Sequence, residues 1–233
     1  PDYERNKERI LDKIDVVDAS FLTTSPDALN FLKGKNCFFI PNPSDSSFET
    51  LNNFEKPCNV DVFFALSHGV HRGVLKSGKT DDRINFLNKL VSITPNIKFD
   101  IYGIKKIQPI WADHYFKTIQ NAKMGLNLSR GDAIKYYSSD RITQIIGNGL
   151  VCLIDEKTNY NNFFNSNEMV FYKNINDLSE KIIKISKDEK LRKKIAMNGK
   201  KKYMKYFNSD LVAQYIINKT LDIKIKKKNY WEK

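Results

Sequence analysis

The stretch 121–155, NAKMGLNLSRGDAIKYYSSDRITQIIGNGLVCLID, contains two short apolar runs separated by a polar segment. The runs occupy residues 124–128 and 150–154, and a polar residue follows each of them. Short apolar runs of this kind are typical of parallel strands that are buried on both faces of a sheet. The stretch therefore predicts two neighbouring strands joined by a longer connection.

The connection between these strands carries the signals of a helix. It begins with three residues that commonly cap helices: Ser138, Ser139 and Asp140. Isoleucines follow at positions 142, 145 and 146, and glycines at 147 and 149 predict the helix end. A helix start presents unpaired backbone N–H groups, and Arg141 lies in the first turn, so we expect an anion to bind there. The alternative is that Ser139 caps a purely structural helix and Arg141 is solvated.

Strands and helices alternate along most of the chain. Further strands are expected at 59–66, 97–103 and 169–174, and helices at 83–93, 114–122 and 175–186. A final helical pair is expected over 188–220, interrupted at Asn198 and Gly199. This alternation predicts an α/β fold with a doubly wound, mostly parallel, Rossmann-like sheet. Ligands of such sheets bind at the carboxyl ends of the strands.

The N-terminal quarter has a different organisation. We expect a helix over 1–14, short strands within 15–24 and 36–41, and a short helix over 25–34 that Ser25 caps and Gly34 ends. Residues 42–57 are rich in Asn, Ser and Pro and are interpreted as a linker. We predict three parts: 1–45, an end piece of a preceding domain with its linker; 46–221, the Rossmann-like domain; and 222–233, a basic tail.

Composition narrows the class of protein. The 233 residues, 41% hydrophobic, suffice for a globular core, and no run of about 18 apolar residues or secretory leader is visible. The chain begins at Pro1 rather than Met, from which we expect a fragment or a processed chain. The three cysteines are odd in number and lack metal-ligand spacing, which favours a reduced, cytoplasmic setting.

The formal net charge of +12 is concentrated at the C-terminal end of the chain. Residues 181–233 contain 17 Lys/Arg and 5 Asp/Glu, whereas residues 1–180 contain 22 of each. Lysines there alternate with aromatic residues, as in KKKYMKYFN at 200–208. Such a surface suits anionic lipid headgroups, polyphosphate or nucleic acid, and it predicts a peripheral membrane contact on the inner face. The alternative is a solvated helix face.

The loop 67–82 follows the first predicted strand of the sheet and is rich in basic and small residues. It includes Ser67, His68, Gly69 and Arg72, and Arg83 opens the next helix. Glycine lets the backbone approach a diphosphate, and arginine grips two oxygens at once. Residues 73–80, GVLKSGKT, match a P-loop formally. The strand before them ends too early and no helix starts at Gly78, which speaks against an ATPase. The three histidines do not form a recognisable metal site.

The order of these motifs resembles a known family. DVFFALSHG (61–69), IKFDIYG (97–103), NAKMGLNLSRG (121–131) and YYSSDRITQIIGNGLVCLIDE (136–156) follow one another as in the nucleotide-binding C-terminal half of GT-B glycosyltransferases of the glycosyl transferases group 1 type. The likeness spans about residues 60–220 and is close to the spore-maturation-protein-like branch. FIPNPSD at 39–45 resembles the crossing between the two GT-B domains, so residues before it would end an acceptor-binding domain.

The resemblance implies a glycosyltransferase of polysaccharide biosynthesis whose donor substrate is a nucleotide diphosphate sugar. The acceptor would be a glycan or a lipid-linked molecule, and the reaction would need no cofactor and no bound metal. The diphosphate would lie near residues 139–141, with Arg83 and the 67–72 loop opposite, and the base near Tyr102. The donor-binding residues would be Ser67, His68, Gly69, Arg72, Arg83, Tyr102, Gly103, Ser138, Ser139, Asp140, Arg141 and Gln144. A catalytic base would belong to the other half, so this chain alone is expected to be slow or inactive.

Two positions depart from the family pattern. Many relatives have glutamates where Gln144 and Tyr136 stand, and an amide holds ribose hydroxyls without the strength of a charge. A non-catalytic nucleotide-binding relative is therefore one alternative. A basic nucleic-acid-binding module is another, but it leaves the segment around Ser138 unexplained, and we expect no nucleic acid as a partner.

Overall fold

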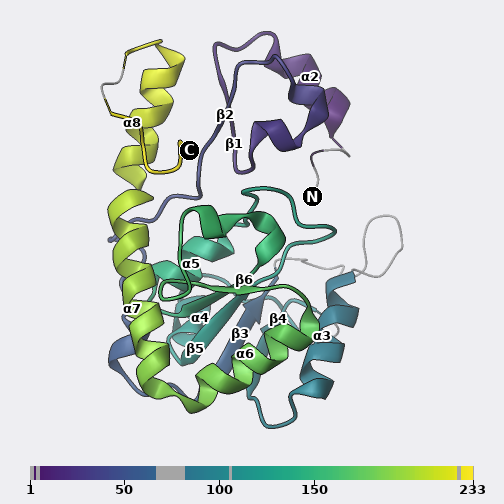
Figure 1. Ribbon diagram of the computed structural model, residues 1–233, viewed down its shortest axis with the longest axis vertical. Helices are drawn as coiled ribbons and strands as arrows, with labels where there is room; N and C mark the ends of the chain where they lie inside the picture. The colour runs from purple at the N-terminus through teal and green to yellow at the C-terminus, as the bar shows by residue number, and fades with distance from the viewer. Residues whose placement is uncertain (1–2, 4–5, 67–81, 105–106, 225–226, 233) are drawn as a thin grey trace.

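A computed structural model describes residues 3, 6–66, 82–104, 107–224 and 227–232 (Figure 1). The N-terminal part contains helix α2 (Lys7–Ile14), strands β1 (Ser20–Leu22) and β2 (Cys37–Phe39), and the 3-10 turns η1 (Pro26–Ala28) and η2 (Asn30–Leu32). Turn η3 (Asn53–Glu55) leads to the larger part: β3 (Val60–Ala65), α3 (Asp82–Ile93), β4 (Phe99–Tyr102), α4 (Ala112–Ile119), β5 (Ala122–Asn127), α5 (Arg141–Gly147), β6 (Val151–Asp155), η5 (Glu156–Thr158), η6 (Tyr160–Asn162), β7 (Val170–Tyr172), α6 (Ile175–Lys187), α7 (Glu189–Tyr206) and α8 (Ser209–Thr220).

The larger part is built on a five-stranded parallel sheet in the order β4-β3-β5-β6-β7. Side chains of β3 alternate between two cores: Val62 and Phe64 face one, and Phe63 and Ala65 face the other. Helices α3 and α6 cover the first core, and α5 covers the second. Both faces of the sheet are therefore covered, and the predicted α/β class with a doubly wound parallel sheet is confirmed.

Helix α5 packs very closely on the sheet. A Cβ added at Gly125 in β5 would lie 2.4 Å from Cγ1 of Ile145. The glycine inside this buried strand is therefore explained by the close approach of the helix that follows it. This contact fixes the start of α5 beside the carboxyl ends of β3 and β5.

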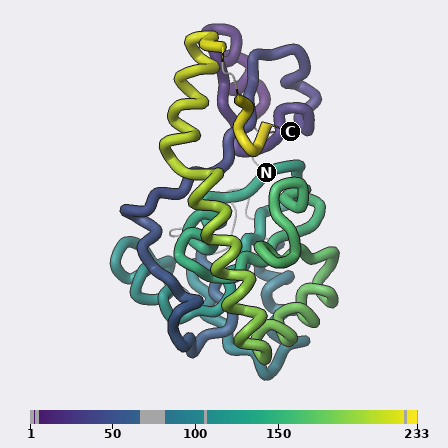
Figure 2. Tube along the Cα trace, turned by 60° about the vertical axis from the view of Figure 1, so that its left-hand side comes forward, coloured from purple at the N-terminus to yellow at the C-terminus, as the bar shows by residue number. Residues whose placement is uncertain are grey.

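The N-terminal part forms a separate small layer. Strands β1 and β2 pair in parallel, and Ile14, Leu29 and Leu32 make a small core beneath them. Helix α8 returns to this layer from the larger part (Figures 1 and 2). The ring of Tyr215 on α8 meets Phe38 edge to face at 6.2 Å between centroids.

Two chain segments cross between the parts and bond to each other. The amide of Ser44 donates to the carbonyl of Phe207 at 2.9 Å, and the amide of Ser209 donates to the carbonyl of Ser44 at 2.8 Å. A short backbone bridge thus joins the two crossing segments, and the parts also meet where the amide of Ser25 donates to the carbonyl of Lys135 at 3.0 Å. The division of the chain at residues 45 and 221 stays a prediction.

The predicted interruption of the last helical pair at Asn198 and Gly199 is wrong. Helix α7 runs through both residues, and the break comes at Phe207, where α8 begins two residues later. A Cβ at Gly199 would lie 2.3 Å from the backbone oxygen of Glu168. Here glycine permits close packing of a helix rather than ending one.

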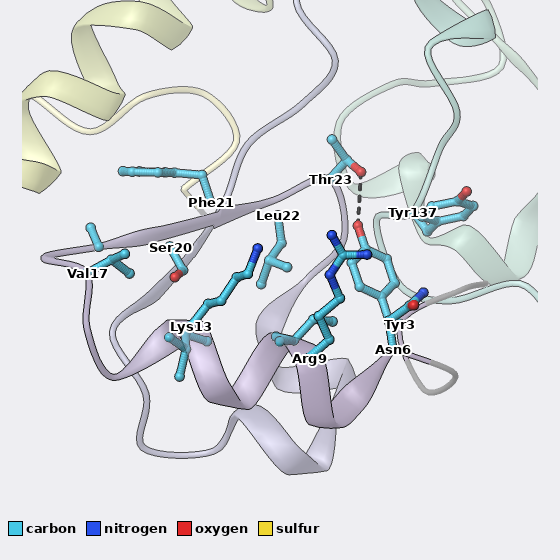
Figure 3. Close-up of a pocket in the computed structure, with 13 residues that line it drawn as sticks. Tyr3, Asn6, Arg9, Lys13, Val17, Ser20, Phe21, Leu22, Thr23 and Tyr137 are labelled. Atoms are coloured by element: carbon cyan, nitrogen blue, oxygen red, sulfur yellow. Dashed lines mark hydrogen bonds between the residues drawn. The ribbon is translucent and has the colours of Figure 1, made fainter.

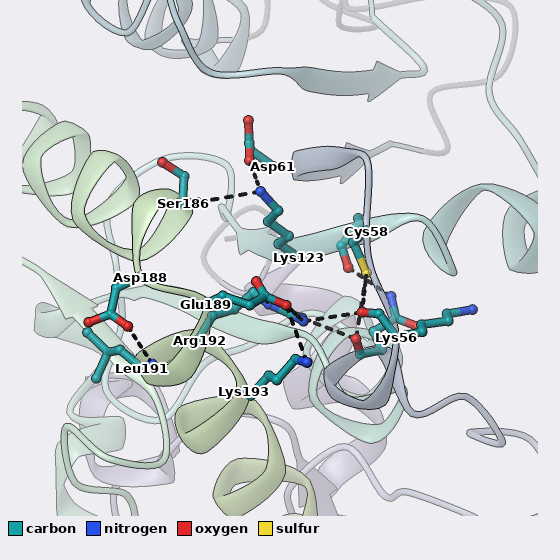
Figure 4. A network of polar contacts seen from close by, with 12 residues as sticks. Lys56, Cys58, Asp61, Lys123, Ser186, Asp188, Glu189, Leu191, Arg192 and Lys193 are labelled. Atoms are coloured by element: carbon teal, nitrogen blue, oxygen red, sulfur yellow. Dashed lines mark hydrogen bonds and ion pairs between the residues drawn. The ribbon is translucent and has the colours of Figure 1, made fainter.

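The segment interpreted as a linker is anchored on α7. The fully buried guanidinium of Arg192 donates from Nη1 to the carbonyl of Asn53 at 3.1 Å and from Nη2 to that of Lys56 at 3.3 Å (Figure 4). Its Nε and Nη2 also bond the two carboxylate oxygens of Glu189, at 2.8 and 2.6 Å. Asn53 in turn donates from Nδ2 to the carbonyl of Ala122 at 2.8 Å.

The short helix expected over 25–34 is replaced by two 3-10 turns. Leu29 between them is extended, with φ −120° and ψ 96°, and its side chain is buried with Leu32. The Ser25 hydroxyl bonds the side chain of Asp27 rather than a backbone amide, so it does not cap the turn. Gly34 ends the segment at φ +79°, as expected of a stop signal.

Among the helices in the described part of the chain, none has the length and apolar character needed to cross a membrane.

Candidate functional site

The strand order creates a crevice between β3 and β5. The chain leaves β3 in one direction to form β4 and returns to the other side of β3 to form β5. When the connections from two neighbouring strands run in opposite directions, a crevice forms at the carboxyl ends of those strands. Open α/β sheets bind their ligands in such a crevice. Ala65 ends β3 and Asn127 ends β5, so these residues mark the expected site.

The side chain of Arg141 lies across this crevice. Its Nε donates to the carbonyl of Ala65 at 3.0 Å, and its Nη1 donates to that of Leu128 at 3.3 Å and to Oγ of Ser139 at 2.7 Å. The guanidinium carbon also lies 5.0 Å from the ring centroid of Phe64. No described residue accepts a hydrogen bond from Nη2. The guanidinium is thus held in one orientation with donor capacity left for an anion.

A second arginine lies close to the first. Arg83 is buried at the start of α3, and the carboxylate of Asp82 accepts from the amides of Arg83 and Gly131, both at 3.1 Å. This carboxylate ties α3 to the segment that follows β5. Burial, and then the charge of Arg83, lower the pKa of Arg141 to about 10, which leaves it charged at neutral pH. A bound anion would relieve both effects.

The prediction that Ser138, Ser139 and Asp140 cap the helix is wrong. Asp140 occupies the N-cap position with helical backbone angles, and no side chain caps the helix. The Ser138 hydroxyl accepts from Nδ2 of Asn42 at 2.9 Å and lies 2.9 Å from the hydroxyl of Tyr160. The Ser139 hydroxyl donates to Oδ1 of Asn127 at 3.1 Å. Both hydroxyls hold the loop in place, and in the described residues Arg141 is the side chain of this segment that keeps a guanidinium N–H donor without an acceptor.

A cavity of about 230 Å³ opens beside Arg141. It is lined by Ala65, Leu66, Ile110, Trp111, Ala112, Tyr115, Phe116, Asp140, Arg141 and Gln144. Three of the predicted site residues, Asp140, Arg141 and Gln144, therefore meet in one cavity. The side-chain amide of Gln144 is partly buried, and no described residue hydrogen-bonds it.

The cavity also contains aromatic residues that sequence reasoning did not select. Trp111 is 59% exposed at the start of α4, and Tyr115 lies one turn further along the helix. The Tyr115 hydroxyl is buried and has no hydrogen-bond partner among the described residues. Burial raises the pKa of Tyr115, so the phenol stays protonated and can donate. The aromatic spacing in 111–116 also suits a helix packed on a core, so the sequence contained no signal that separated the two roles.

Tyr102 and Gly103 lie at the carboxyl end of β4, beside the same crevice. Gly103 has φ +79°, and a Cβ there would lie 1.9 Å from the carbonyl oxygen of Leu66, a cavity residue. Tyr102 is partly buried and meets His114 edge to face at 6.3 Å between centroids. Four predicted site residues, Ser67, His68, Gly69 and Arg72, and the P-loop-like residues 73–80 lie outside the described residues.

Tyr136, which stands at the upstream glutamate position of the resemblance, belongs to the core. It is 6% exposed, and its ring lies 4.6 Å from that of Phe163 and 5.2 Å from that of Phe39. Its hydroxyl accepts a hydrogen bond from Nδ2 of Asn162 at 3.0 Å. The residue has φ 60° and adopts a left-handed backbone conformation. The side chain at this position thus packs between the two parts of the molecule.

A larger hollow of about 680 Å³ lies between α2 and β1 (Figure 3). Arg9 and Lys13, one turn apart on α2, point into it, and Tyr137 lines its far side. The Tyr3 ring meets that of Tyr137 edge to face at 6.1 Å. Tyr137 precedes the Arg141 cavity by a few residues, so one segment of the chain borders both hollows.

No group of three or more His, Cys, Asp or Glu residues within the described ranges is arranged to hold a metal ion.

Comparisons with known proteins agree with the observed fold. One solved structure of similar fold is that of TarM, which is 13% identical with a TM-score of 0.65; the match covers 93% of this chain and 46% of TarM. S. aureus TarM has also been solved in a complex that contains UDP. Sucrose-phosphate synthase from Thermosynechococcus elongatus is 12% identical with a TM-score of 0.56, and the match covers 93% of this chain and 62% of that one. HepE from Anabaena, solved in complex with UDP, is 10% identical with a TM-score of 0.59, and the match covers 88% of this chain and 64% of that one. The chain spans about half to two thirds of the length of these proteins. No curated protein matches the sequence significantly.

These structures have the GT-B glycosyltransferase fold, and at such identities the similarity shows the fold alone. The sequence itself supplies the family. A family model described as glycosyl transferase-like matches residues 83–218, from the start of α3 to the last turns of α8. Since this match covers more than half of the chain, the protein belongs to the glycosyl transferase-like family.

Proposed function

We propose that the crevice between β3 and β5 binds a nucleotide diphosphate sugar and that the chain supplies the donor-binding half of a glycosyltransferase. The observation that carries this proposal is the position of Arg141. Its guanidinium is held by the carbonyls of Ala65 and Leu128, at the ends of the two strands that border the crevice. A cation held this way before ligand binding needs little reorganisation to bind a diphosphate.

The reaction would be transfer of a hexosyl or related group from the donor to a glycan or lipid-linked acceptor. Cleavage of the bond between sugar and diphosphate leaves negative charge on the departing diphosphate. Arg141, with Arg83 close enough to lower its pKa, would stabilise that charge. No metal or cofactor is required in this proposal, because the two guanidinium groups supply the positive charge.

The base and ribose are assigned to the aromatic side of the cavity. Trp111 offers an exposed ring for stacking, and Tyr115 offers a hydroxyl that no described residue hydrogen-bonds. Gln144 lies in the same cavity and would hydrogen-bond the ribose hydroxyls. Tyr102 and Gly103 would border the base from the end of β4.

The acceptor would approach from the side of the N-terminal part. The hollow beside Arg9 and Lys13 is open and basic, and Tyr137 connects its wall to the segment that carries Arg141. An acceptor with an anionic group suits these charges. Membership of the spore-maturation-protein-like branch, a cytoplasmic location and a role in polysaccharide biosynthesis belong to the same proposal and rest on the resemblance of the motifs.

The second candidate is a non-catalytic nucleotide-binding relative. It is favoured by Gln144 and by the burial of Tyr136, since neither supplies a carboxylate to the site. Measurement of donor hydrolysis and of sugar transfer separates the two candidates, because only the enzyme releases the nucleotide diphosphate. Nucleic-acid binding has no comparable support from the geometry.

Titration calorimetry with UDP, GDP and their sugars tests the proposal. Arg141→Ala should weaken binding by roughly 10- to 100-fold, because charge-assisted hydrogen bonds contribute about 1.5–3 kcal/mol. Arg9→Ala is the matched control, since it removes an arginine outside the donor cavity and should leave the affinity unchanged. Because Arg141 also bonds strand ends, each variant needs a thermal melt to show that it is folded at the titration temperature.

Gln144→Glu tests the ribose assignment with the cavity volume kept. A carboxylate accepts hydrogen bonds from ribose hydroxyls more strongly than an amide, so we expect tighter binding of nucleotides but not of inorganic diphosphate.

Equal affinity of the wild type and of Arg141→Ala for every nucleotide would remove the crevice from consideration as the donor site.

A further inference from the structure

The C-terminal end of α8 exposes three large aliphatic side chains. Ile217 is 53% exposed, Leu221 is 65% exposed and Ile223 is 49% exposed. The amide of Leu221 donates to the carbonyl of Ile217 at 3.0 Å, and that of Ile223 donates to the carbonyl of Asn218 at 2.8 Å. Asp222 between them has φ 50°. This left-handed helix end turns the backbone at Ile223 back toward the last turn, and the three residues at this turn are together called the α8 tip.

Basic residues follow the α8 tip directly. Lys224, Lys227 and Lys228 are exposed, and within the described part of the chain none of them forms an ion pair. Glu232 in the same region is paired with Lys219, at 3.4 Å between Oε1 and Nζ. Asp222 is the acidic residue at the tip itself. The positive charge is therefore in excess around the α8 tip.

A hollow of about 450 Å³ adjoins the tip, between α8 and the returning chain. It is lined by Lys205, Tyr206, Leu211, Gln214, Tyr215, Asn218, Lys227, Lys228, Asn229 and Tyr230. The rings of Tyr206 and Tyr230 stack at 4.6 Å between centroids and hold the returning chain on α7. The described lining thus contains ammonium, phenol and amide groups, and no carboxylate. These groups suit phosphate oxygens.

We propose that the α8 tip docks on the surface of an anionic lipid bilayer. The aliphatic side chains would enter the headgroup region while the lysines, and the hollow beside them, meet lipid phosphates. A nucleic-acid backbone would satisfy the lysines but would gain nothing from Ile217, Leu221 and Ile223, which is why the bilayer is favoured. The tip lies at the end of the molecule away from the junction of α6 and α7 (Figures 1 and 2).

This inference does not depend on donor binding, because the tip and the donor cavity share no residue. Docking through the tip would hold the donor half beside a lipid-linked acceptor. The two proposals therefore fail separately: calorimetry with nucleotides reports on the cavity, and vesicle binding reports on the tip.

Co-sedimentation of the chain with vesicles tests the inference. The chain should bind vesicles of phosphatidylglycerol and phosphatidylcholine and not vesicles of phosphatidylcholine alone. Replacing Lys224, Lys227 and Lys228 with Glu should lower partitioning by about fivefold or more per lysine, since each contributes about 1 kcal/mol near an anionic surface. Ile217→Ser with Leu221→Ser should lower it by at least tenfold, because the changes remove about six aliphatic carbons and burial of only two of them, at about 0.8 kcal/mol each, already accounts for that factor.

The matched control makes the same charge change elsewhere. Lys184, Lys187 and Lys190 are exposed near the junction of α6 and α7, and their replacement with Glu should leave vesicle binding largely unchanged. All changed side chains are exposed, so circular dichroism should show a folded chain in each case. Loss of binding in the tip variants with retention in the control supports the inference.

Four outcomes would overturn it. They are absence of binding to anionic vesicles, an equal loss in the control variant, unchanged binding after the two serine substitutions, and tighter binding to oligonucleotides than to vesicles. Formation of a dimer that the serine substitutions abolish would likewise assign the α8 tip to a second copy of the chain instead of a bilayer.

Discussion

The unpaired hydroxyl of Tyr115 leads to a prediction in which stability and ligand affinity change in opposite directions. Tyr115 lines the cavity beside Arg141, and its hydroxyl is buried with no hydrogen-bond partner among the described residues. If the cavity binds a nucleotide, the hydroxyl is available to donate to it. Tyr115→Phe removes this one group and keeps the ring, which meets Phe63 edge to face at 5.3 Å between centroids.

The magnitude follows from the price of burying an unbonded polar group. That penalty is about 1–3 kcal/mol, so Tyr115→Phe should stabilise the free protein by about 1 kcal/mol after allowing for relaxation. For a chain of this size the melting temperature should rise by about 2–4 °C. A hydrogen bond to ligand contributes about 0.5–1.5 kcal/mol, so the affinity for UDP or GDP should fall by roughly three- to tenfold.

Tyr172→Phe is the matched control. The Tyr172 hydroxyl is also buried without a partner among the described residues, but it lies on β7 and does not line the donor cavity. This variant should raise the melting temperature by a similar amount and leave nucleotide affinity unchanged. Differential scanning calorimetry and titration calorimetry measure both quantities on the same samples.

The reasoning is refuted if Tyr115→Phe lowers the melting temperature of the free protein while nucleotide affinity stays at the wild-type value. That result would mean that the hydroxyl stabilises the fold and takes no part in ligand binding. Equal weakening of nucleotide binding by Tyr172→Phe would show that the effect is not specific to the cavity.

Other substitutions test the packing on which the crevice depends. Gly199→Ala should lower the free energy of unfolding, measured in urea, by about 1–3 kcal/mol. The added Cβ would overlap a backbone oxygen, and this cost outweighs the roughly 1 kcal/mol by which alanine stabilises a helix relative to glycine. A more stable variant would contradict the close approach. Gly103→Ala should lower both nucleotide affinity and the free energy of unfolding, because its Cβ would displace the end of β3. If the affinity measured by calorimetry is unchanged, that strand end lies outside the site. Hydrogen bonds from Arg192 lower the pKa of Glu189 below its ordinary 4.5. The ionised carboxylate therefore stabilises the fold above that pH, and its contribution is lost as the pH falls through the lowered pKa. Glu189→Gln should be less stable than the wild type at neutral pH and equal to it in acid; a deficit independent of pH would show that charge plays no part.

The regular parts of the fold were predictable because their signals are local. The apolar runs of β3, β5 and β6 are short, and glycine or polar residues bound them, which suffices to predict buried parallel strands. The glycines at 125, 103 and 199 were harder to interpret. Each permits a close contact with a segment distant in sequence, so nothing in its own neighbourhood distinguished it from a stop signal.

The site was predictable in part. The segment around Arg141 was selected from its residue types, and the structure brings Arg141, Asp140 and Gln144 into one cavity. Two cavity residues, Trp111 just before α4 and Tyr115 on it, were missed because an aromatic residue in such a segment most often packs in a core. The hydroxyl of Ser139, expected to cap the helix, instead bonds Asn127, a partner supplied by another strand.

Sequence by itself determined the class of the fold, the order of its strands and helices, and the segment that carries Arg141, since hydrophobic periodicity, turn residues and residue chemistry are properties of short stretches. Only the tertiary structure decided that β3 and β5 diverge at a crevice and that Arg141 spans it. It also brought the α4 aromatics into the cavity and folded the end of α8 into an aliphatic tip among lysines. Those features depend on distances between residues far apart in the chain, which packing of the whole molecule sets.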